Sequence, residues 1–369
     1  MRAWYYPQDG EDFETAVNRE VVAARTSAGL LDASTLGKID IRGKDAAEFL
    51  NRVYTNAFGK LAVGRCRYGL MLKEDGMVMD DGVTTRLADD HFHMTTTTGG
   101  AAGVLDWLEE FSQTEWPELE VYMTSVTEQW SVATLSGPNA KKILEAAGVD
   151  FALDDTNFPF MSMKEGHIAG LPARIFRISF TGELSYEINV PARYGLALWT
   201  TLMSAGKDFG ITPYGTEAMH VLRAEKGFII VGQETDGTVN PIDLGMDWIV
   251  SKKKPDFIGK RALERVSMAD TNRKQLVGLK TRDPKAVIPE GAHAVLDPNQ
   301  PAPMDMLGQI TSSYYSPNLG HSIAMGLLKN GHAMRGQTVY IPMLNGEAPI
   351  EAVITDTVFY DPKGERLNG

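Results

Sequence analysis

The sequence contains a single cysteine, Cys66, among 369 residues, so an internal disulfide and a metal site built from several thiolates are both excluded. No run of about 18 consecutive apolar residues occurs, and we expect no membrane-spanning helix. The N-terminal stretch lacks an apolar secretory core and soon turns acidic, which favours a cytoplasmic location. The net charge of −12 disfavours nucleic acid and anionic membranes as partners, but it leaves room for a small anionic ligand.

Several sequence motifs that would indicate a bound cofactor or a catalytic nucleophile are also absent. No Gly-x-Gly-x-x-Gly opens a helix after a strand, and neither a Walker loop nor a Gly-x-Ser-x-Gly elbow is present. His91 and His93 share one strand face, but without a third ligand in sight we interpret them as structural or surface residues rather than metal-binding ones. Cys66 lies between Arg65 and Arg67, which favours a thiolate, yet no nearby histidine offers a base.

The length and composition are those of a globular protein with more than one domain. A chain of 369 residues with 43% hydrophobic residues exceeds what one core usually serves. The pattern Gly-x-Asp-Ala-x-x-Phe-Leu at 43–50 returns as Gly-x-Asn-Ala-x-x-Ile-Leu at 137–144, each time between a strand and an amphipathic helix. This repeat predicts two related α/β subdomains, with breaks near residues 45 and 130.

Periodicity changes near residue 270. Helices are expected over 12–28 with Gly29 as the stop, over 194–204, and over 216–226 with Gly227 as the stop. After residue 270, short apolar segments recur at near-regular intervals with almost no helical periodicity, which is typical of a small β-barrel or sandwich. We therefore expect an α+β fold, with one region over 1–270 and a C-terminal β-barrel over 271–369.

Two adjacent carboxylates, Asp80 and Asp81, interrupt a segment that otherwise has the composition of a strand, and Gly76 supplies a turn before it. Neighbours on a strand point to opposite faces, so one aspartate can reach water while the other points inward. An ionised carboxylate inside a protein is costly unless it is paired or used. The local sequence is consistent with two interpretations. Either both aspartates are solvated at the end of a strand, or one of them is a functional acid.

Other polar residues are embedded in apolar or strand-like context, namely Tyr68, Glu187, Arg223 and Glu225. They could be satisfied ion pairs, for example a buried bridge between Arg223 and Glu187. Alternatively, carboxylates, an arginine and aromatic faces together suit a flat heteroaromatic ligand with amide-like edges and an anionic tail, such as a pterin.

These segments resemble landmarks of the glycine-cleavage T-protein (aminomethyltransferase) family, in the right order along nearly the whole chain. The landmarks include GRCRYGLMLKEDGMVMDD, FTGELSYEINVP, LRAEKGFIIVG and GQITSSYYSPNLGHSIAMG. DASTLGKIDI and DLGMDWIVSKKKPDFIGKR are similar to the branch found in the folate-binding C-terminal half of the α subunit of heterotetrameric sarcosine oxidase. The resemblance implies a three-domain cloverleaf, with the two related subdomains around a tetrahydrofolate site.

The resemblance also implies roles for individual residues. Asp80 would be the catalytic carboxylate beside the reactive nitrogens of tetrahydrofolate, where it stabilises developing positive charge, and Asp81 would be structural. Glu187 would hold the pterin edge. The predicted folate-contacting residues are Tyr68, Asp80, Phe180, Glu187, Arg223 and Leu36. Two places depart from the family: Thr35 and Leu36 replace a histidine and a methionine, and Phe180 replaces a tyrosine.

The expected activity is tetrahydrofolate-dependent methylene transfer from an oxidised N-methyl amine such as sarcosine, giving 5,10-methylenetetrahydrofolate. Because the chain has no flavin motif, the oxidation would take place on a flavin-containing partner subunit. Two alternatives stay open. One is a folate-dependent demethylase acting on a sulfonium or N-methyl donor, and the other is a non-catalytic folate-binding module.

Overall fold

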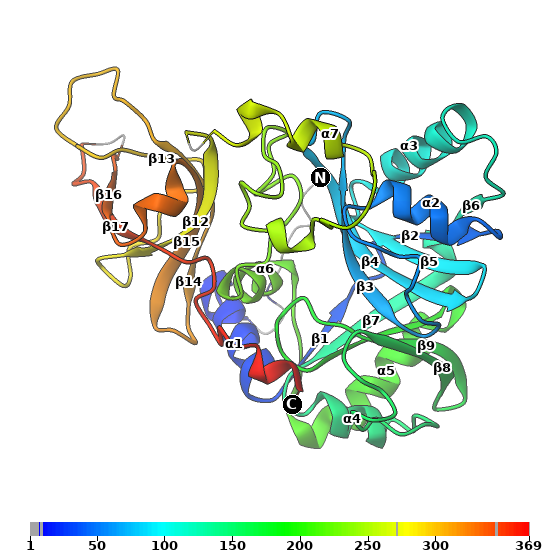
Figure 1. Cartoon of the computed structure of the whole chain (residues 1–369). Helices are drawn as coiled ribbons and strands as arrows, with labels where there is room; N and C mark the ends of the chain where they lie inside the picture. The colour runs from blue at the N-terminus through cyan, green and yellow to red at the C-terminus, as the bar shows by residue number, and fades with distance from the viewer. Residues whose placement is uncertain (1–6, 8–9, 271, 344–345, 369) are drawn as a thin grey trace.

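The computed structural model describes residue 7 and residues 10–270, 272–343 and 346–368. Figure 1 shows three sheets: a barrel-like sheet on one side of the molecule, and two sheets stacked on the other. Helices α1 (Phe13–Thr26) and α6 (Thr216–Glu225) pack on each other between these parts. The predicted α+β architecture is confirmed.

The first of the two stacked sheets has five strands in the order β3-β4-β5-β2-β6. Its outer face is covered by α2 and α3, and residues such as Phe49 and Leu108 form the core between them. We call the opposite face of this sheet the inner face. The elements are β2 (Gly37–Arg42), α2 (Ala46–Val53), β3 (Cys66–Leu72), β4 (Val78–Ala88), β5 (His91–Thr96), α3 (Ala101–Thr114) and β6 (Tyr122–Ser125).

The second stacked sheet has six strands in the order β11-β1-β7-β10-β9-β8, and α4 and α5 cover its outer face. The predicted repeat is seen as β2–α2 and β7–α4, with Gly43 and Gly137 both at positive φ between strand and helix. The elements are β1 (Ala28–Asp32), β7 (Trp130–Ser136), α4 (Ala140–Ala146), β8 (Ser162–Ile168), β9 (Leu171–Arg177), β10 (Ser185–Pro191), α5 (Gly195–Gly206) and β11 (Ile211–Pro213).

The third sheet begins at residue 274 and forms the expected C-terminal barrel. Its order is β13-β14-β15-β12-β17-β16, and a bridge between Val295 and Tyr340 joins its two edges. Backbone pairing across this bridge closes the sheet around an apolar core. The strands are β12 (Lys274–Thr281), β13 (His293–Ala294), β14 (Gly308–Ser316), β15 (His321–Lys329), β16 (Thr338–Ile341) and β17 (Ile350–Thr355).

Short helices occupy several connections. They are η1 (Thr127–Gln129), η2 (Ala192–Tyr194), η3 (Lys207–Phe209), η4 (Asp247–Ile249), α7 (Lys260–Leu263), η5 (Val266–Met268), η6 (Gly331–Met334) and η7 (Glu365–Asn368). The predicted stop at Gly227 is confirmed, since this residue has φ 69° just after α6. The predicted stop at Gly29 is wrong: α1 ends at Thr26, and Gly29 lies in β1 between Ser136 and Thr212.

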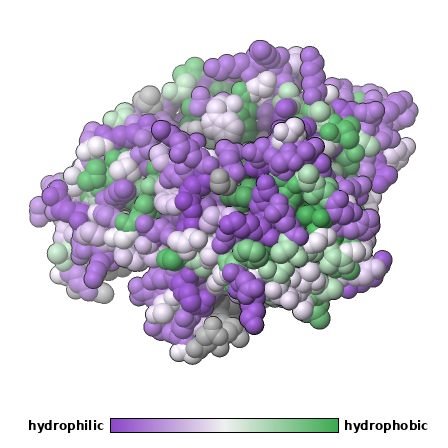
Figure 2. All heavy atoms as spheres, turned by 90° about the horizontal axis from the view of Figure 1, so that it is seen from below, coloured by the Kyte–Doolittle hydropathy of each residue, from purple (hydrophilic) through white to green (hydrophobic). Residues whose placement is uncertain are grey.

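Figure 2 shows a largely hydrophilic face on which hydrophobic side chains gather only in small, separate groups. Within the described residues, no helix has both the length and the apolar composition needed to cross a membrane.

Candidate functional site

The inner face of the five-stranded sheet lies against the β8–β10 side of the six-stranded sheet. The ring of His93 on β5 stacks on Phe176 of β9, with ring centroids 5.8 Å apart. Cys66 on β3 joins Phe176 and Met163 in a small apolar cluster between the sheets. Polar side chains on these two surfaces are therefore close in space although they are far apart in sequence.

Tyr68 and Asp81 form a polar pair on the inner face. The Tyr68 hydroxyl donates a hydrogen bond of 2.6 Å to Oδ2 of Asp81, and both residues remain partly accessible. Burial raises the pKa of the Asp81 carboxyl to about 7, although the hydrogen bond from Tyr68 opposes this shift. A carboxyl group with a pKa near neutrality is suited to accept and return a proton at physiological pH.

Asp80 points to the opposite face, under α2 and α3. The carboxylate is 1% exposed, and it accepts hydrogen bonds from the Asp81 N–H at 2.8 Å and from the Thr97 hydroxyl at 3.1 Å. Its Oδ2 lies where a Cβ on Gly100 would be only 2.2 Å away, so it is packed against the start of α3. Burial raises the pKa of Asp80, and these hydrogen bonds oppose the rise. The structure therefore places Asp80 in the connection to α3, away from Tyr68.

A β-bulge determines which aspartate faces the tyrosine. Leu72 pairs with Val78 beside the turn, but the next pair is Met71 with Asp80, so one residue of β4 is extra. Without this extra residue, Asp80 would point to the same face as the tyrosine, because a one-residue shift exchanges the faces of a strand. The two aspartates do lie on opposite faces, as expected, but Asp81 is the one that reaches the inner face.

Glu187 lies on β10, between Thr134 of β7 and Phe176 of β9, on the surface that faces the other sheet. Burial raises the pKa of its carboxyl to about 7, and the positive charge of Lys38 opposes this shift. Among the described residues, no group donates a hydrogen bond to this carboxylate. An acceptor that is largely buried and lacks a protein donor fits a ligand that presents N–H groups, as the edge of a pterin does.

Lys38 is a buried lysine on β2 that sequence reasoning missed. Its side chain is 1% exposed, and Nζ donates hydrogen bonds to the carbonyls of Ser34 at 2.9 Å and Leu36 at 2.8 Å. The Ser34 hydroxyl in turn accepts a hydrogen bond from the Val132 N–H on β7. The turn over residues 33–36 is thereby tied to both sheets. The sequence did contain a sign of this buried lysine: Lys38 and Asp40 occupy alternate positions of an otherwise apolar strand, so both point to the same face.

The predicted bridge between Arg223 and Glu187 is wrong. Arg223 is fully buried and donates to Glu234 at 2.8 Å and to the Ser312 hydroxyl of β14 at 2.6 Å. Both members of the ion pair are 0% exposed. Arg223 therefore joins α6 to the barrel, and the structure does not bring it together with Glu187.

The two remaining predicted folate-contacting residues are Phe180 and Leu36. The Phe180 ring lies 6.3 Å from that of Phe228, centroid to centroid. Leu36 is half-buried in the turn that Lys38 holds. Their contacts with a ligand stay predictions.

The residues considered for a metal site or a nucleophile are satisfied within the protein. His91 and His93 both hydrogen-bond to Asp40, at 2.9 and 2.7 Å. Burial raises the pKa of the Cys66 thiol to about 12, so the thiolate that the flanking arginines favour is suppressed. Across the described part of the chain, no group of three or more His, Cys, Asp or Glu side chains could hold a metal ion.

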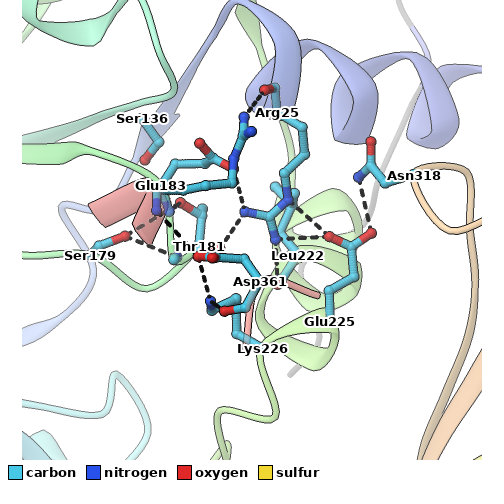
Figure 3. Close-up of polar contacts among 12 residues, drawn as sticks. Arg25, Ser136, Ser179, Thr181, Glu183, Leu222, Glu225, Lys226, Asn318 and Asp361 are labelled. Atoms are coloured by element: carbon cyan, nitrogen blue, oxygen red, sulfur yellow. Dashed lines mark hydrogen bonds and ion pairs between the residues drawn. The ribbon is translucent and has the colours of Figure 1, made fainter. Parts of the chain in front are cut away.

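A buried ion network joins α1 and α6 to the barrel, to the segment before β10 and to the C-terminal segment (Figure 3). Arg25 on α1 pairs with Glu225 at 2.8 Å and with Glu183 at 2.9 Å. Glu225 also accepts a hydrogen bond from Ser316 of the barrel, and Arg366 from the C-terminal segment pairs with Glu183. Each carboxylate has several donors, so we interpret this network as a structural junction rather than a binding site.

The chain matches two known sequence families over most of its length. Residues 1–254 match the GCVT N-terminal domain, and residues 274–361 match the glycine cleavage T-protein C-terminal barrel domain. The chain belongs to the glycine-cleavage T-protein family. A solved relative of this family, the glycine cleavage system aminomethyltransferase T from Bartonella henselae, has the same fold. It superimposes with a TM-score of 0.81 over 93% of this chain and 89% of its own, at 26% identity.

Curated relatives of the T-protein family fall into two groups. The sarcosine oxidase subunit alpha of Corynebacterium sp. (strain P-1) is 53% identical over 100% of this chain, and the aminomethyltransferase of Halothermothrix orenii is 31% identical over 90% of it. The match covers 88% of the aminomethyltransferase but 38% of the sarcosine oxidase subunit. The names of both groups are those of enzymes or enzyme subunits, and the predicted family membership is confirmed.

Proposed function

We propose that this chain catalyses tetrahydrofolate-dependent transfer of a methylene unit from an oxidised N-methyl amine such as sarcosine, giving 5,10-methylenetetrahydrofolate. The observation that carries the proposal is the placement of two carboxyl groups with pKa values near 7, Asp81 and Glu187, on facing sheets. The high identity to sarcosine oxidase α subunits supports the amine donor and a flavin-containing partner subunit.

In this proposal, Glu187 accepts the N–H donors of the pterin edge, and Leu36 and Phe180 line the pocket. Tetrahydrofolate supplies the amines that accept the one-carbon unit. Asp81, rather than Asp80, takes the catalytic role, because its carboxylate shares the accessible inner face with Tyr68. There it stabilises developing positive charge and takes up the proton that is released. The Tyr68 hydroxyl holds the Asp81 oxygen in one orientation.

Binding of tetrahydrofolate is expected to stabilise the fold. At about 100 times its dissociation constant, a ligand that binds only the folded state adds roughly 2.7 kcal/mol to the free energy of unfolding. The measurement is thermal unfolding of the chain with and without saturating, anaerobically kept tetrahydrofolate. An unchanged melting temperature in a correctly folded sample would reject the site.

The purified chain by itself is expected to be colourless and to consume no oxygen when sarcosine is added. The reason is that its sequence contains no motif for a flavin or nicotinamide nucleotide, so the oxidation requires a partner. Absorbance spectra and oxygen-electrode traces test this. A stoichiometric flavin on the isolated chain would contradict it.

The product distinguishes this activity from the alternatives. Methylenetetrahydrofolate indicates methylene transfer, methyltetrahydrofolate indicates a demethylase, and folate binding without turnover indicates a binding module. Chromatographic identification of the folate product decides among the three, when the product is formed with formaldehyde, with the amine and its oxidase, and with an unoxidised sulfonium or N-methyl donor alone.

A further inference from the structure

We propose that Lys38 is a positioning residue for the Glu187 site: it supplies a buried positive charge to this carboxylate and fixes the adjacent turn, so that the site selects ligands with paired N–H donors. The inference rests on the proposed function, because it concerns how the same site recognises the pterin edge. No motif in the sequence marks Lys38 for such a role.

The contacts of Lys38 fix its position from both sides. Its ammonium group has three N–H donors, and two of them reach the carbonyls of Ser34 and Leu36. The same turn is anchored on β7 through the Ser34 hydroxyl and Val132. Removing the ammonium group would therefore free the turn that carries Leu36, and it would remove one buried positive charge.

Of the described groups around Glu187, Lys38 is the one whose charge lowers the pKa of the Glu187 carboxyl. The titratable groups that interact electrostatically with Glu187 are Lys38 on β2, Cys66 on β3 and Tyr214 after β11. Burial raises the pKa values of the Cys66 thiol and the Tyr214 hydroxyl to about 12, so both groups are neutral near pH 7. Lys38 is then the one cation that acts on Glu187 within the described residues.

The positive charge of Lys38 is stabilised by three nearby carboxylates. Burial lowers its pKa, while the negative charges of Glu187, Glu128 and Asp32 oppose that shift. The lysine and Glu187 therefore support each other's ionised forms. A carboxylate in this state accepts two parallel N–H donors from a flat ligand edge, whereas a protonated carboxyl group would repel one of them.

The test is the pH dependence of tetrahydrofolate affinity in Lys38→Met, measured by anaerobic titration between pH 5.5 and 9. In the wild type, affinity should fall below pH 7 as Glu187 takes up a proton. Loss of a nearby cation should raise the midpoint by about one pH unit, so the affinity at pH 7 should fall about fivefold and recover by pH 9. Lys38→Arg should keep the wild-type midpoint.

Lys44→Met is the matched control, because this lysine just after β2 is exposed and pairs with Glu120 at the surface. If Lys38→Met does not fold, Lys38→Gln removes the charge but keeps a donor for the turn, and it carries the same test. An equal loss of affinity at every pH would mean that Lys38 acts only on structure, and the proposal would fail while the proposed function stands. Absence of binding by the wild type at every pH would overturn both.

Discussion

Replacing Asp81 by asparagine is expected to lower the rate of methylene transfer by roughly 10²–10³-fold, which corresponds to about 3–4 kcal/mol of transition-state stabilisation. The substitution keeps the shape and the contact with Tyr68 but removes the charge. Tetrahydrofolate affinity should fall less, because the charge matters most once positive charge develops. Single-turnover formation of methylenetetrahydrofolate from formaldehyde, corrected for the uncatalysed rate, measures the effect.

Asp80→Asn provides the matched control on the neighbouring residue. Asp80 contacts Thr97 and packs against the start of α3, so this change should act through stability and leave single-turnover rates close to those of the wild type. Asp81→Asn should be at least as stable as the wild type above pH 7. There the native Asp81, whose pKa is raised to about 7, must carry a charge that burial disfavours. Equal rate losses in both variants would mean that the pair is structural, and a larger loss in Asp80→Asn would restore the assignment made from sequence.

Replacing Arg223 by methionine is expected to lower the free energy of unfolding by about 3–5 kcal/mol. The change leaves Glu234 as an uncompensated buried charge and removes the contact with Ser312 of the barrel. Urea unfolding, followed by circular dichroism, measures the loss. The folded fraction should bind tetrahydrofolate with wild-type affinity, because Arg223 does not lie beside Glu187.

Two further variants complete this experiment. Arg223→Met combined with Glu234→Gln should recover part of the lost stability, since the buried charge is then removed along with its partner. Arg261→Met is the exposed control, because this arginine is 91% exposed and should change stability by less than about 0.5 kcal/mol. If Arg223→Met reduced folate affinity without changing the unfolding curve, the guanidinium group would be a folate ligand, as the resemblance implied.

Most of the fold could be predicted from the sequence, because its helices and strands follow clear local patterns of hydrophobic and turn residues. The repeat of strand, glycine and helix around residues 43 and 137 corresponds to the two stacked sheets. The change from helical periodicity to short apolar segments near residue 270 precedes the barrel. The error at Gly29 has a local cause. Glycine often ends a helix, but here the chain turns at Ser27 and the glycine enters a strand.

The candidate site was harder to predict because two of its features are not local. The faces of Asp80 and Asp81 depend on one bulged residue near Met79, and nothing in the sequence marks that bulge. The partner of Arg223 depends on which of several glutamates the tertiary fold brings near. Glu234 lies in a segment that reads only as an irregular loop. Composition identified the kinds of residue in the site, but their pairing required the structure.

The junction around Arg25 has a consequence for how the chain is made. Arg366 donates a hydrogen bond to the backbone carbonyl of Arg25 across 341 positions of sequence. At roughly 5–20 residues per second, a ribosome adds the second partner about 20–70 s after the first. During this interval the first helix has been synthesised, but one donor to its junction does not yet exist. The segment around Arg366 therefore completes a junction that α1 begins, and this junction can be complete only after the 341 positions between the two arginines have been translated.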